Sequence, residues 1–403
     1  MKKLVSILSI IWVLQACENS STLAMHTTNA QAIDSLPGGC PFLTKDQNGN
    51  TVLSWIQNTT DSSSVFCYAV SKDGGNSFGT PVQIPGSQNV HEHSENIPKV
   101  IFKPSGEIIA IWGAANPNPK NKYSGVVYYA QSFDNGKNWS APKQLVTAAD
   151  GFDQRYFDVA LLSNGEAAII WLDNRKVSNK EGSALYMAAT NGSSGFSNEK
   201  RIQEQCCPCC RTEVFVDSKD NLHILYRGII NDTIRDMVHT VSVDGGKSFS
   251  TPERISNDNW VISGCPHTGP AMAETKNGLH FAWFTGGQKK GSFYTSSTDN
   301  GKTFLGHDSI STKGAHSQLC ALSNGEVVAV WDETVVQPSL TQSRIGIQKR
   351  NSNGRAESKS FIADGNARVS YPVVAETKNE KVLVAYCQEK QNKDYVMWQL
   401  LNE

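Results

Sequence analysis

Four cysteines stand within one five-residue stretch of the sequence, Cys206-Cys-Pro-Cys-Cys210. A thiolate is both a nucleophile and a ligand for soft metals, so thiols this close together can pair as disulfides or hold Cu(I) or Zn(II). In an oxidising compartment a disulfide from this loop to Cys265 or Cys40 is the first interpretation. The thiols that we expect to lie together are those of Cys207, Cys209, Cys210 and Cys265.

A metal site at these cysteines is the alternative interpretation, with His267, His91 or His93 as further ligands. The spacing C-C-x-C-C matches no standard zinc pattern, which keeps the disulfides first. The sequence holds ten cysteines in all. Three others fall within strand-like runs and are expected to be small buried packing residues: Cys67, Cys320 and Cys387.

Arginine and acidic side chains gather in the segments that join strand-like runs. Guanidinium groups that meet at one place grip carboxylates bidentately, so such a gathering indicates an anion site. The alternative is that these side chains form salt bridges between neighbouring units or cap strands. The candidate ligand-binding residues are Arg155, Arg211, Arg235, Asp236, Glu95 and Arg368.

A short turn pattern, S-x-D-x-G-x-x-[FW], occurs four times between strand-like runs. In such a turn the Asp carboxylate accepts hydrogen bonds from turn amides, the Gly adopts a conformation that other residues avoid, and the ring packs on the sheet. A fifth stretch, Thr190–Phe196, keeps the aromatic residue and lacks the Asp. The four full copies are Ser71–Phe78, Ser132–Trp139, Ser242–Phe249 and Ser297–Phe304.

A second repeat has seven copies. Each is a strand, a tight turn of the Asn-Gly kind and a strand that ends in an aromatic residue, and this pattern is typical of β-hairpins. The aromatic residues recur about every 50 to 60 residues, as in propellers. We therefore predict an all-β propeller of seven four-stranded blades, with six as the alternative. The aromatic residues are Trp55, Trp112, Trp171, Tyr226, Trp283, Trp331 and Tyr386.

The last predicted blade lacks a fourth strand, because only five residues follow Trp398. An open edge in a closed ring is a liability, so an upstream segment must supply it. Residues 28–35 are the expected closing strand. This layout places the repeated turns on one side of the ring and the candidate ligand-binding segments on the other, around an axial funnel. There we expect four side chains, with at least one carboxylate from Glu95, Asp158, Asp236 or Glu333, to face one cavity: Arg155, Arg211, Arg235 and Tyr371.

The repeated turn resembles the Asp-box of bacterial neuraminidases (sialidases), and the resemblance covers nearly all of residues 40–400. It implies a structural role for the box aspartates Asp73, Asp134, Asp244 and Asp299. It also implies a Tyr nucleophile paired with a Glu, an Asp as acid/base, and three arginines that hold the carboxylate of sialic acid. Carried onto this sequence, the catalytic candidates are Tyr371, Glu333 and Asp158.

The chain departs from the family in two respects. The family's propeller usually has six blades, and its Arg-Ile-Pro motif is absent here, since Asn96-Ile-Pro-Lys99 stands at the comparable point. The cysteine stretch followed by Gly264-Cys-Pro-His267 also resembles uncharacterised exported sialidase-like proteins. The resemblance therefore implies the fold more firmly than the activity.

Residues 1–17 have the features of an export signal: Lys2-Lys3, an apolar run and Leu14-Gln-Ala-Cys17. The last four residues resemble a bacterial lipobox, which predicts lipidation at Cys17; an ordinary signal peptide is the alternative. Residues 18–27 are expected to form a flexible tether and residues 28–403 a single propeller domain. We therefore expect a lipoprotein of the cell envelope, anchored to a membrane, periplasmic or on the cell surface.

Three functions stay open. The first is a sialidase-type exo-glycosidase with no organic cofactor, the second a non-catalytic propeller that binds a glycan or a partner, and the third a thiol- or metal-handling lipoprotein. The expected ligand is a glycan or another small anion, and the expected state is a monomer. The net charge of −1 and the lack of a long basic run argue against nucleic acid as the main partner.

Overall fold

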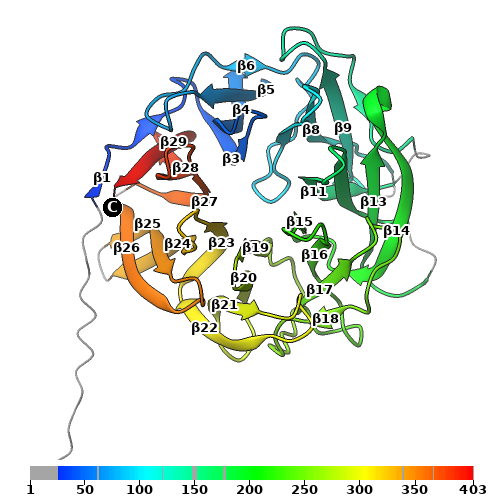
Figure 1. Cartoon of the computed structure of the whole chain (residues 1–403), viewed down its shortest axis with the longest axis vertical. Helices are drawn as coiled ribbons and strands as arrows, with labels where there is room; N and C mark the ends of the chain where they lie inside the picture. The colour runs from blue at the N-terminus through cyan, green and yellow to red at the C-terminus, as the bar shows by residue number, and fades with distance from the viewer. Residues whose placement is uncertain are drawn as a thin grey trace, which may run out of the picture.

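Seven antiparallel sheets surround one axis, as Figure 1 shows. The computed structural model describes residues 26–60, 63–119, 121–147, 152–175, 178–337, 340–365 and 367–402. The prediction of a seven-bladed propeller with four strands per blade is confirmed. Each blade runs outward from the axis in chain order, and its first strand lies innermost (Figure 1).

The strands of the first four blades are as follows. Blade 1 has β3 (Gly38–Lys45), β4 (Thr51–Thr60), β5 (Ser63–Ser71) and β6 (Val82–Gln83); blade 2 has β7 (Lys99–Phe102), β8 (Ile108–Ala115), β9 (Gly125–Ser132) and β10 (Lys143–Gln144). Blade 3 has β11 (Gln154–Leu161), β12 (Ala167–Asp173), β13 (Ser183–Thr190) and β14 (Phe196–Cys206), with a 3-10 turn (Gly192–Ser194) before β14. Blade 4 has β15 (Glu213–Val216), β16 (Leu222–Arg227), β17 (Met237–Ser242) and β18 (Glu253–Arg254).

The remaining blades complete the ring. Blade 5 has β19 (Ala271–Thr275), β20 (Gly278–Thr285), β21 (Gly291–Ser297) and β22 (Leu305–Ser311). Blade 6 has β23 (Gly314–Ala321), β24 (Val327–Gln337), β25 (Leu340–Arg350) and β26 (Ala356–Gly365). Blade 7 has β27 (Val369–Glu376), β28 (Val382–Lys390), β29 (Lys393–Asn402) and, as its outer edge, β1 (His26–Thr27) and β2 (Gln31–Ala32).

The seven repeated aromatic residues occupy the second strand of their blades, and all are buried. Their polar ring atoms find partners, which burial requires. Trp171 Nε1, for example, donates to Asp173 Oδ2 at 3.1 Å, and Trp331 Nε1 donates to Glu333 Oε2 at 2.8 Å. These rings fill the spaces between blades, because a single sheet cannot bury both of its faces.

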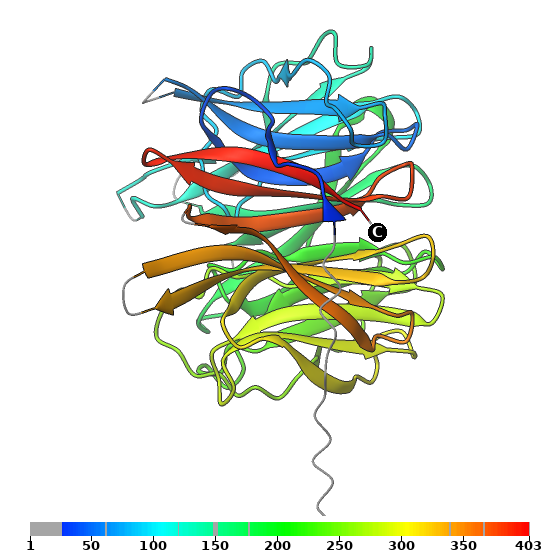
Figure 2. The same cartoon turned by 90° about the vertical axis from the view of Figure 1, so that its left-hand side faces the viewer.

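The N-terminal segment closes the ring, as predicted. Gln31 and Ala32 pair with Trp398 and Met397 of β29, and Figure 2 shows the blue N-terminal strand beside the red C-terminal blade. The predicted tether is wrong at its end, because His26 and Thr27 also pair with β29. Those two residues form backbone hydrogen bonds that a free linker would not make.

The predicted export signal, Cys17 and the rest of the tether lie outside the described residues. Among the residues that are described, no helix is long and apolar enough to cross a membrane.

The four Asp-box turns share one hydrogen-bond pattern. In the last of them Asp299 Oδ1 accepts from Ser297 Oγ at 2.8 Å and from the Thr303 amide at 2.9 Å, and Asp299 Oδ2 accepts from Thr303 Oγ1 at 2.6 Å. Burial alone raises the pKa of Asp299, but the hydrogen bonds from Thr303 and Ser297 outweigh it and lower the pKa to about 2. The box carboxylates are thus occupied within their own turns.

Each box also contacts the blade before it. The box ring of blade 1, Phe78, lies edge-on to Trp398 of blade 7 at 5.1 Å between centroids. At Gly301, where φ is +78°, a Cβ atom would lie 2.2 Å from a ring carbon of His239 in blade 4. The degenerate box keeps this contact, since Phe196 packs on Tyr129 of blade 2 at 5.2 Å. The Asp-box therefore joins neighbouring blades.

Deletion of residues 26–33 should lower the free energy of unfolding by about 2–4 kcal/mol, because it removes several edge hydrogen bonds and exposes the edge of β29. The bonds include Thr28 N to Leu400 O and Ile33 N to Val396 O. Urea unfolding followed by tryptophan fluorescence measures the change, with deletion of residues 18–25 as the control. Equal stability of the two deletions would contradict closure by this segment.

Asp299→Asn should lower stability at neutral pH by about 1 kcal/mol, a small value because the carboxylate is only partly buried and solvent screens it. The pKa is depressed on folding, so the carboxylate stabilises fully above pH about 4 and this contribution is lost as pH falls through about 2. Thermal unfolding of wild type and variant should therefore converge at low pH. The exposed Glu357→Gln serves as the control, and a pH-independent difference would refute the assignment.

Candidate functional site

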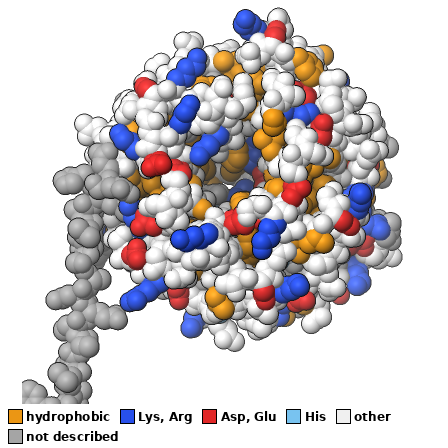
Figure 3. Space-filling view, in the orientation of Figure 1, with side chains coloured by type: hydrophobic (Ala, Val, Ile, Leu, Met, Phe, Trp, Pro, Cys, Tyr) orange, Lys and Arg blue, Asp and Glu red, His pale blue; other side chains and the backbone are white. Residues whose placement is uncertain are grey.

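A cavity of about 540 Å³ opens on the side of the ring opposite the Asp-boxes. Its walls come from the segments that enter first strands and from the loop after β8, as the sequence predicted. Figure 3 shows the molecule hollowed at the centre of the ring. The side chains that matter below are those of His91, His93, Asn96, Arg155, Tyr156, Cys209, Cys265 and His267.

Irregularities in the first strands place side chains at this end of the axis. The pairing of β11 with β12 shifts between Arg155 and Asp158, and Tyr156 has a φ of +55°. The same shift occurs in blade 6 at His316, with a φ of +51°, and in blade 7 at Tyr371, with a φ of +52°. A β-bulge re-aims a side chain, so these residues leave the regular in-and-out alternation of the strand.

Aromatic and imidazole rings cluster in the cavity. The ring centroids of His93 and Tyr156 are 5.6 Å apart, and those of His93 and His267 are 5.4 Å apart. Burial, with His267, His91 and Arg155 nearby, lowers the pKa of His93 to about 4. Burial raises the pKa of Tyr156 above its ordinary value. At neutral pH the cavity therefore offers a neutral imidazole and a protonated phenol.

Arg155 places a guanidinium group in the cavity. Its Nη2 contacts Asp153 Oδ2 at 2.5 Å, and its guanidinium lies 5.5 Å from the centroid of the Tyr156 ring. Its Nε is buried and has no hydrogen-bond partner in the described part of the chain. A buried donor without a partner is costly unless a ligand fills it. The Arg155 Nε is therefore a buried donor that no described residue occupies.

Glu95 and Arg211, both predicted for the ligand site, do meet on the axis. The backbone amide of Arg211 donates to Glu95 Oε2 at 3.4 Å, and Arg211 Nη1 lies 3.4 Å from Glu213 Oε2. The amide oxygen of Gln318 in blade 6 accepts from both terminal nitrogens of Arg211, at 2.9 and 3.0 Å. Burial raises the pKa of Glu95, although Arg211 and His316 oppose the shift. Arg211 thus spans the axis from blade 4 to blade 6.

The pair His316 and Asp332 is a site that the sequence did not reveal. His316 Nδ1 lies 2.8 Å from Asp332 Oδ2, which also accepts from the Tyr371 amide at 2.7 Å. The rings of His316 and Tyr371 lie 4.0 Å apart. Burial alone lowers the pKa of His316, but Asp332 reverses the shift and raises it. The available signal was positional, because His316 stands at the same point of a first strand, β23, as Tyr371 does in β27.

Asp158, a predicted acid/base, belongs to a buried ion pair. Its Oδ1 lies 3.3 Å from Lys99 Nζ, and its Oδ2 accepts from the Val214 amide at 2.7 Å. Beside it, burial and then the charge of Asp158 raise the pKa of Glu213 to about 8. These side chains come from blades 2, 3 and 4. These contacts match the alternative interpretation of the sequence, in which charged side chains form salt bridges between neighbouring blades.

The prediction that four residues share one axial cavity is wrong. Arg155 lines the cavity of about 540 Å³, whereas Arg235 lines a second one of about 410 Å³ and pairs there with Glu181 at 2.5 Å. Arg211 and Tyr371 line neither. Separate connecting segments hold these side chains, so equivalent positions in the repeat did not bring them to one place.

Three more candidates make contacts far from a shared site. Glu333 accepts from Trp331 Nε1 at 2.8 Å and from Arg344 Nη2 at 2.7 Å within blade 6. Asp236 accepts from the amides of Asn259 and Trp260, at 2.9 and 3.0 Å. Arg368 is 76% exposed in its side chain and lies 3.8 Å from Glu389.

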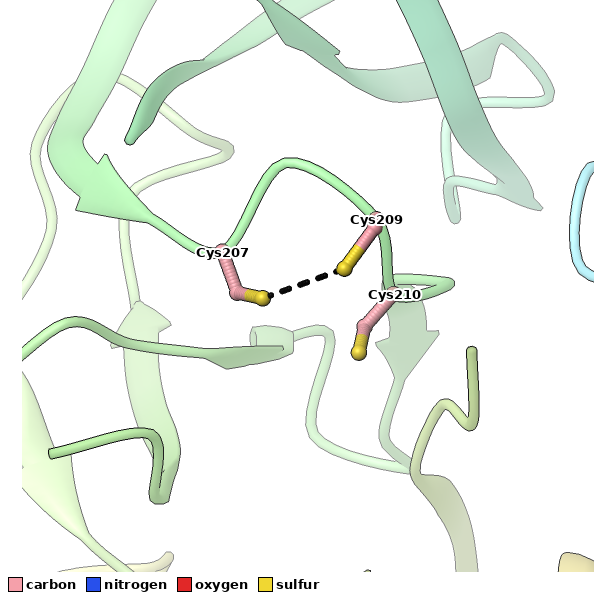
Figure 4. Close-up of side chains that lie close together, drawn as sticks. All are labelled: Cys207, Cys209 and Cys210. Atoms are coloured by element: carbon pink, nitrogen blue, oxygen red, sulfur yellow. Dashed lines mark hydrogen bonds between the residues drawn. The ribbon is translucent and has the colours of Figure 1, made fainter. Parts of the chain in front are cut away.

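The cysteine stretch forms a tight group of three thiols. The sulfurs of Cys207, Cys209 and Cys210 all lie within 4.8 Å of one another and are buried, and those of Cys207 and Cys209 are 3.5 Å apart. Figure 4 shows the three side chains pointing toward one another. Cys265 is exposed and lines both cavities without joining the group. The nine cysteines of the described residues are free thiols here.

The same cavity brings the predicted histidines near this group, since His91, His93 and His267 line it together with Cys209. His267 Nδ1 is buried without a hydrogen-bond partner in the described part of the chain. Cys67 and Cys387 are buried in strands β5 and β28, as expected, while Cys320 in β23 is half-buried.

Comparison with known proteins agrees with the fold and the repeat. Residues 87–264, which span blades 2 to 4, match the family model of the BNR repeat-like domain. Among curated proteins, none matches the chain.

Solved structures of low sequence identity share the architecture. A protein of unknown function from Dyadobacter fermentans is 14% identical, covers 94% of this chain and 99% of its own, and has a TM-score of 0.55. The polysaccharide lyase Uly1 is 11% identical over 92% of this chain and 91% of its own, with a TM-score of 0.56. The intramolecular trans-sialidase of Ruminococcus gnavus is 9% identical over 91% and 94%, with a TM-score of 0.51. Residues 87–264 are thus similar to the BNR repeat-like domain, and the chain as a whole shares its propeller fold with these solved structures.

Proposed function

We propose that the protein binds an acidic saccharide in the cavity beside Arg155 and cleaves it by elimination next to the sugar carboxylate. The observation that carries the proposal is the composition of the cavity. Its described lining contains an arginine, three histidines and tyrosines, and it contains no aspartate or glutamate.

Binding follows from charge. Arg155 keeps a buried, unpartnered Nε, and Lys122 adds a second cation to the lining. A guanidinium fork suits a carboxylate. Asp153 balances the charge of Arg155, so Lys122 gives the described lining its net positive charge, because no acidic side chain is part of that lining. Rings such as Tyr123, which is 72% exposed, offer an apolar surface for a sugar ring. An acidic sugar fits all three features.

The elimination requires three groups. Arg155 neutralises the carboxylate and so acidifies the neighbouring C5–H bond of a uronate. Neutral His93 takes that proton at Nδ1 when the substrate displaces the Glu95 amide, which donates to this atom at 3.2 Å. The electron pair forms the C4=C5 double bond as the C4–O bond breaks, and protonated Tyr156 donates its proton to the leaving oxygen. Contacts join these residues in the cavity: His93 to Tyr156, and Arg155 to Tyr156.

Sialidase-type hydrolysis, the activity first expected from the sequence, is the second candidate. What favours it is the surroundings of Glu95, whose charge acts on the pKa of both Tyr371 and Tyr156. Tyr371 could then be a nucleophile with Glu95 as its proton acceptor. Against it, Glu95 is 2% exposed and already bound to Arg211, and Glu333 and Asp158 are engaged elsewhere.

The solved structures with this fold are compatible with both elimination and hydrolysis and favour neither. They include a polysaccharide lyase and an intramolecular trans-sialidase, and one fold can carry both activities. Export and lipid anchoring through Cys17 remain part of the proposal, because a polymeric glycan is met outside the cytoplasm.

The purified protein should release unsaturated products from uronate polysaccharides, seen as new ultraviolet absorbance of the conjugated double bond. Arg155→Gln should raise KM, since it removes the carboxylate partner. His93→Asn should lower kcat by at least about 100-fold, as expected for loss of a catalytic base. Arg368→Gln is the matched control, because this arginine lies exposed on the surface.

A panel of fluorogenic sialosides is run in parallel. If the protein hydrolyses a sialoside and His93→Asn keeps this activity, the reaction is hydrolysis and not elimination. If the wild type binds the polysaccharide saturably but forms no product, the protein is a binding module and not an enzyme for this substrate. Equal binding by wild type and Arg155→Gln would remove this cavity from the function.

The pH profile gives a further prediction. A histidine base is active when neutral, and the lowered pKa of His93 is about 4. With elimination, kcat/KM should therefore stay level as the pH falls from about 7 and decline only near pH 4, since this ratio reports the free enzyme. A decline near pH 6.5, the ordinary pKa of histidine, would contradict a base with the lowered pKa of His93.

A further inference from the structure

The turn that follows β14 brings three sulfurs to one point. The Cys207 amide donates to Arg227 O at 2.8 Å, which fixes the start of the turn against β16. Pro208 then reverses the chain, so that Cys209 and Cys210 face back toward Cys207, as Figure 4 shows. All three residues are at most 5% exposed. The backbone therefore holds the thiols together before any ligand is bound.

The spacing of the sulfurs suits metal coordination. A zinc–sulfur bond of about 2.3 Å puts two sulfurs of a tetrahedral site about 3.8 Å apart and those of a trigonal site about 4.0 Å apart. The observed triangle has one edge of 3.5 Å, and no edge exceeds 4.8 Å. Small side-chain rotations would bring all three to bonding distance. The sulfur pair at 3.5 Å is too far apart for a disulfide bond, which is about 2.05 Å long.

A buried arginine provides the electrostatic argument. Arg227 is 2% exposed, and its Nε donates to Cys210 Sγ at 3.3 Å. Its other donors reach only backbone oxygens, those of Arg235, Thr268 and Phe284. No ion pair among the described residues joins Arg227 to a carboxylate. A buried cation without a counter-charge is costly, so the sulfurs are where its negative partner must lie.

The group is also accessible from one side. Cys207 and Cys210 pack among apolar side chains, including Tyr226 and Ile229. Cys209 lines both the larger and the smaller cavity. An ion could therefore enter past Cys209, and a fourth coordination position would face the cavity.

We propose that Cys207, Cys209 and Cys210 form a three-thiolate site for a thiophilic cation. Each thiol releases its proton to solvent as its metal–sulfur bond forms. Zinc fits best by charge, because three thiolates, one Zn²⁺ and the Arg227 guanidinium sum to zero, whereas Cu⁺ leaves one negative charge. Three protein ligands with an open position facing a cavity is the arrangement of metal sites that bind a further ligand.

The purified protein, kept reduced, is titrated with Zn²⁺ and separately with Cu⁺ against a chromophoric chelator, and bound metal is measured by mass spectrometry. We expect one ion per chain. Cys209→Ser should weaken binding by at least about 100-fold, beyond what loss of an outer-shell partner causes. Cys320→Ser, a half-buried thiol in β23, should bind as wild type does. Circular dichroism confirms that each variant is folded.

Two measurements on the wild type keep the proposal testable if a variant fails to fold. Cobalt(II) should give an intense thiolate charge-transfer band, which zinc then abolishes. Thiol counting on denatured, unreduced protein should find all nine cysteines of the described residues reactive. Two missing thiols that map to Cys207 and Cys209, or no retained metal in folded reduced protein, would overturn the site. None of these outcomes depends on the sugar chemistry proposed above.

Discussion

The structure depends on the packing of each blade against its neighbours. A four-stranded sheet with two apolar faces is not stable by itself, so every blade needs one before it and one after it. Two kinds of ring supply the contact: the buried aromatic residue of the second strand and the aromatic residue of the Asp-box. The box that lacks its aspartate still keeps Phe196 against Tyr129, which indicates that the contact between blades matters more than the turn.

The candidate functional side chains lie at irregular points of the scaffold, in bulges and connecting segments. Bulges at Tyr156, His316 and Tyr371 break the alternation of the first strands and place polar rings toward the axis. Near them the Arg211 amide donates to Glu95, and the terminal nitrogens of Arg211 donate to Gln318. These contacts join blades 4 and 6, and groups held on strands of a scaffold are positioned more precisely than groups held on loops alone.

Sequence patterns predicted the fold closely because its determinants are local. The hairpins, the repeated turns and the missing last strand each have a signature of a few residues, and together they gave seven blades and their closure. The site was predicted less well. Arg235 and Glu333 stand at the expected points of the repeat, but Glu181 and Arg344 hold their side chains elsewhere. Such partners, and the bulge that re-aims His316, depend on tertiary contacts that no short pattern records.

The closing strand also constrains the order of folding. The edge of blade 7 joins Gln31 and Ala32, near the start of the chain, to Met397 and Trp398, near its end. The first strand to leave the ribosome therefore waits for the last one, and until then the ring stays open at one seam with two unsatisfied sheet edges. Contacts between such distant residues make the final step slow. If the chain is exported, it would complete this step only after its last strand has crossed the membrane, and the half-formed ring would be the form most exposed to aggregation and proteolysis.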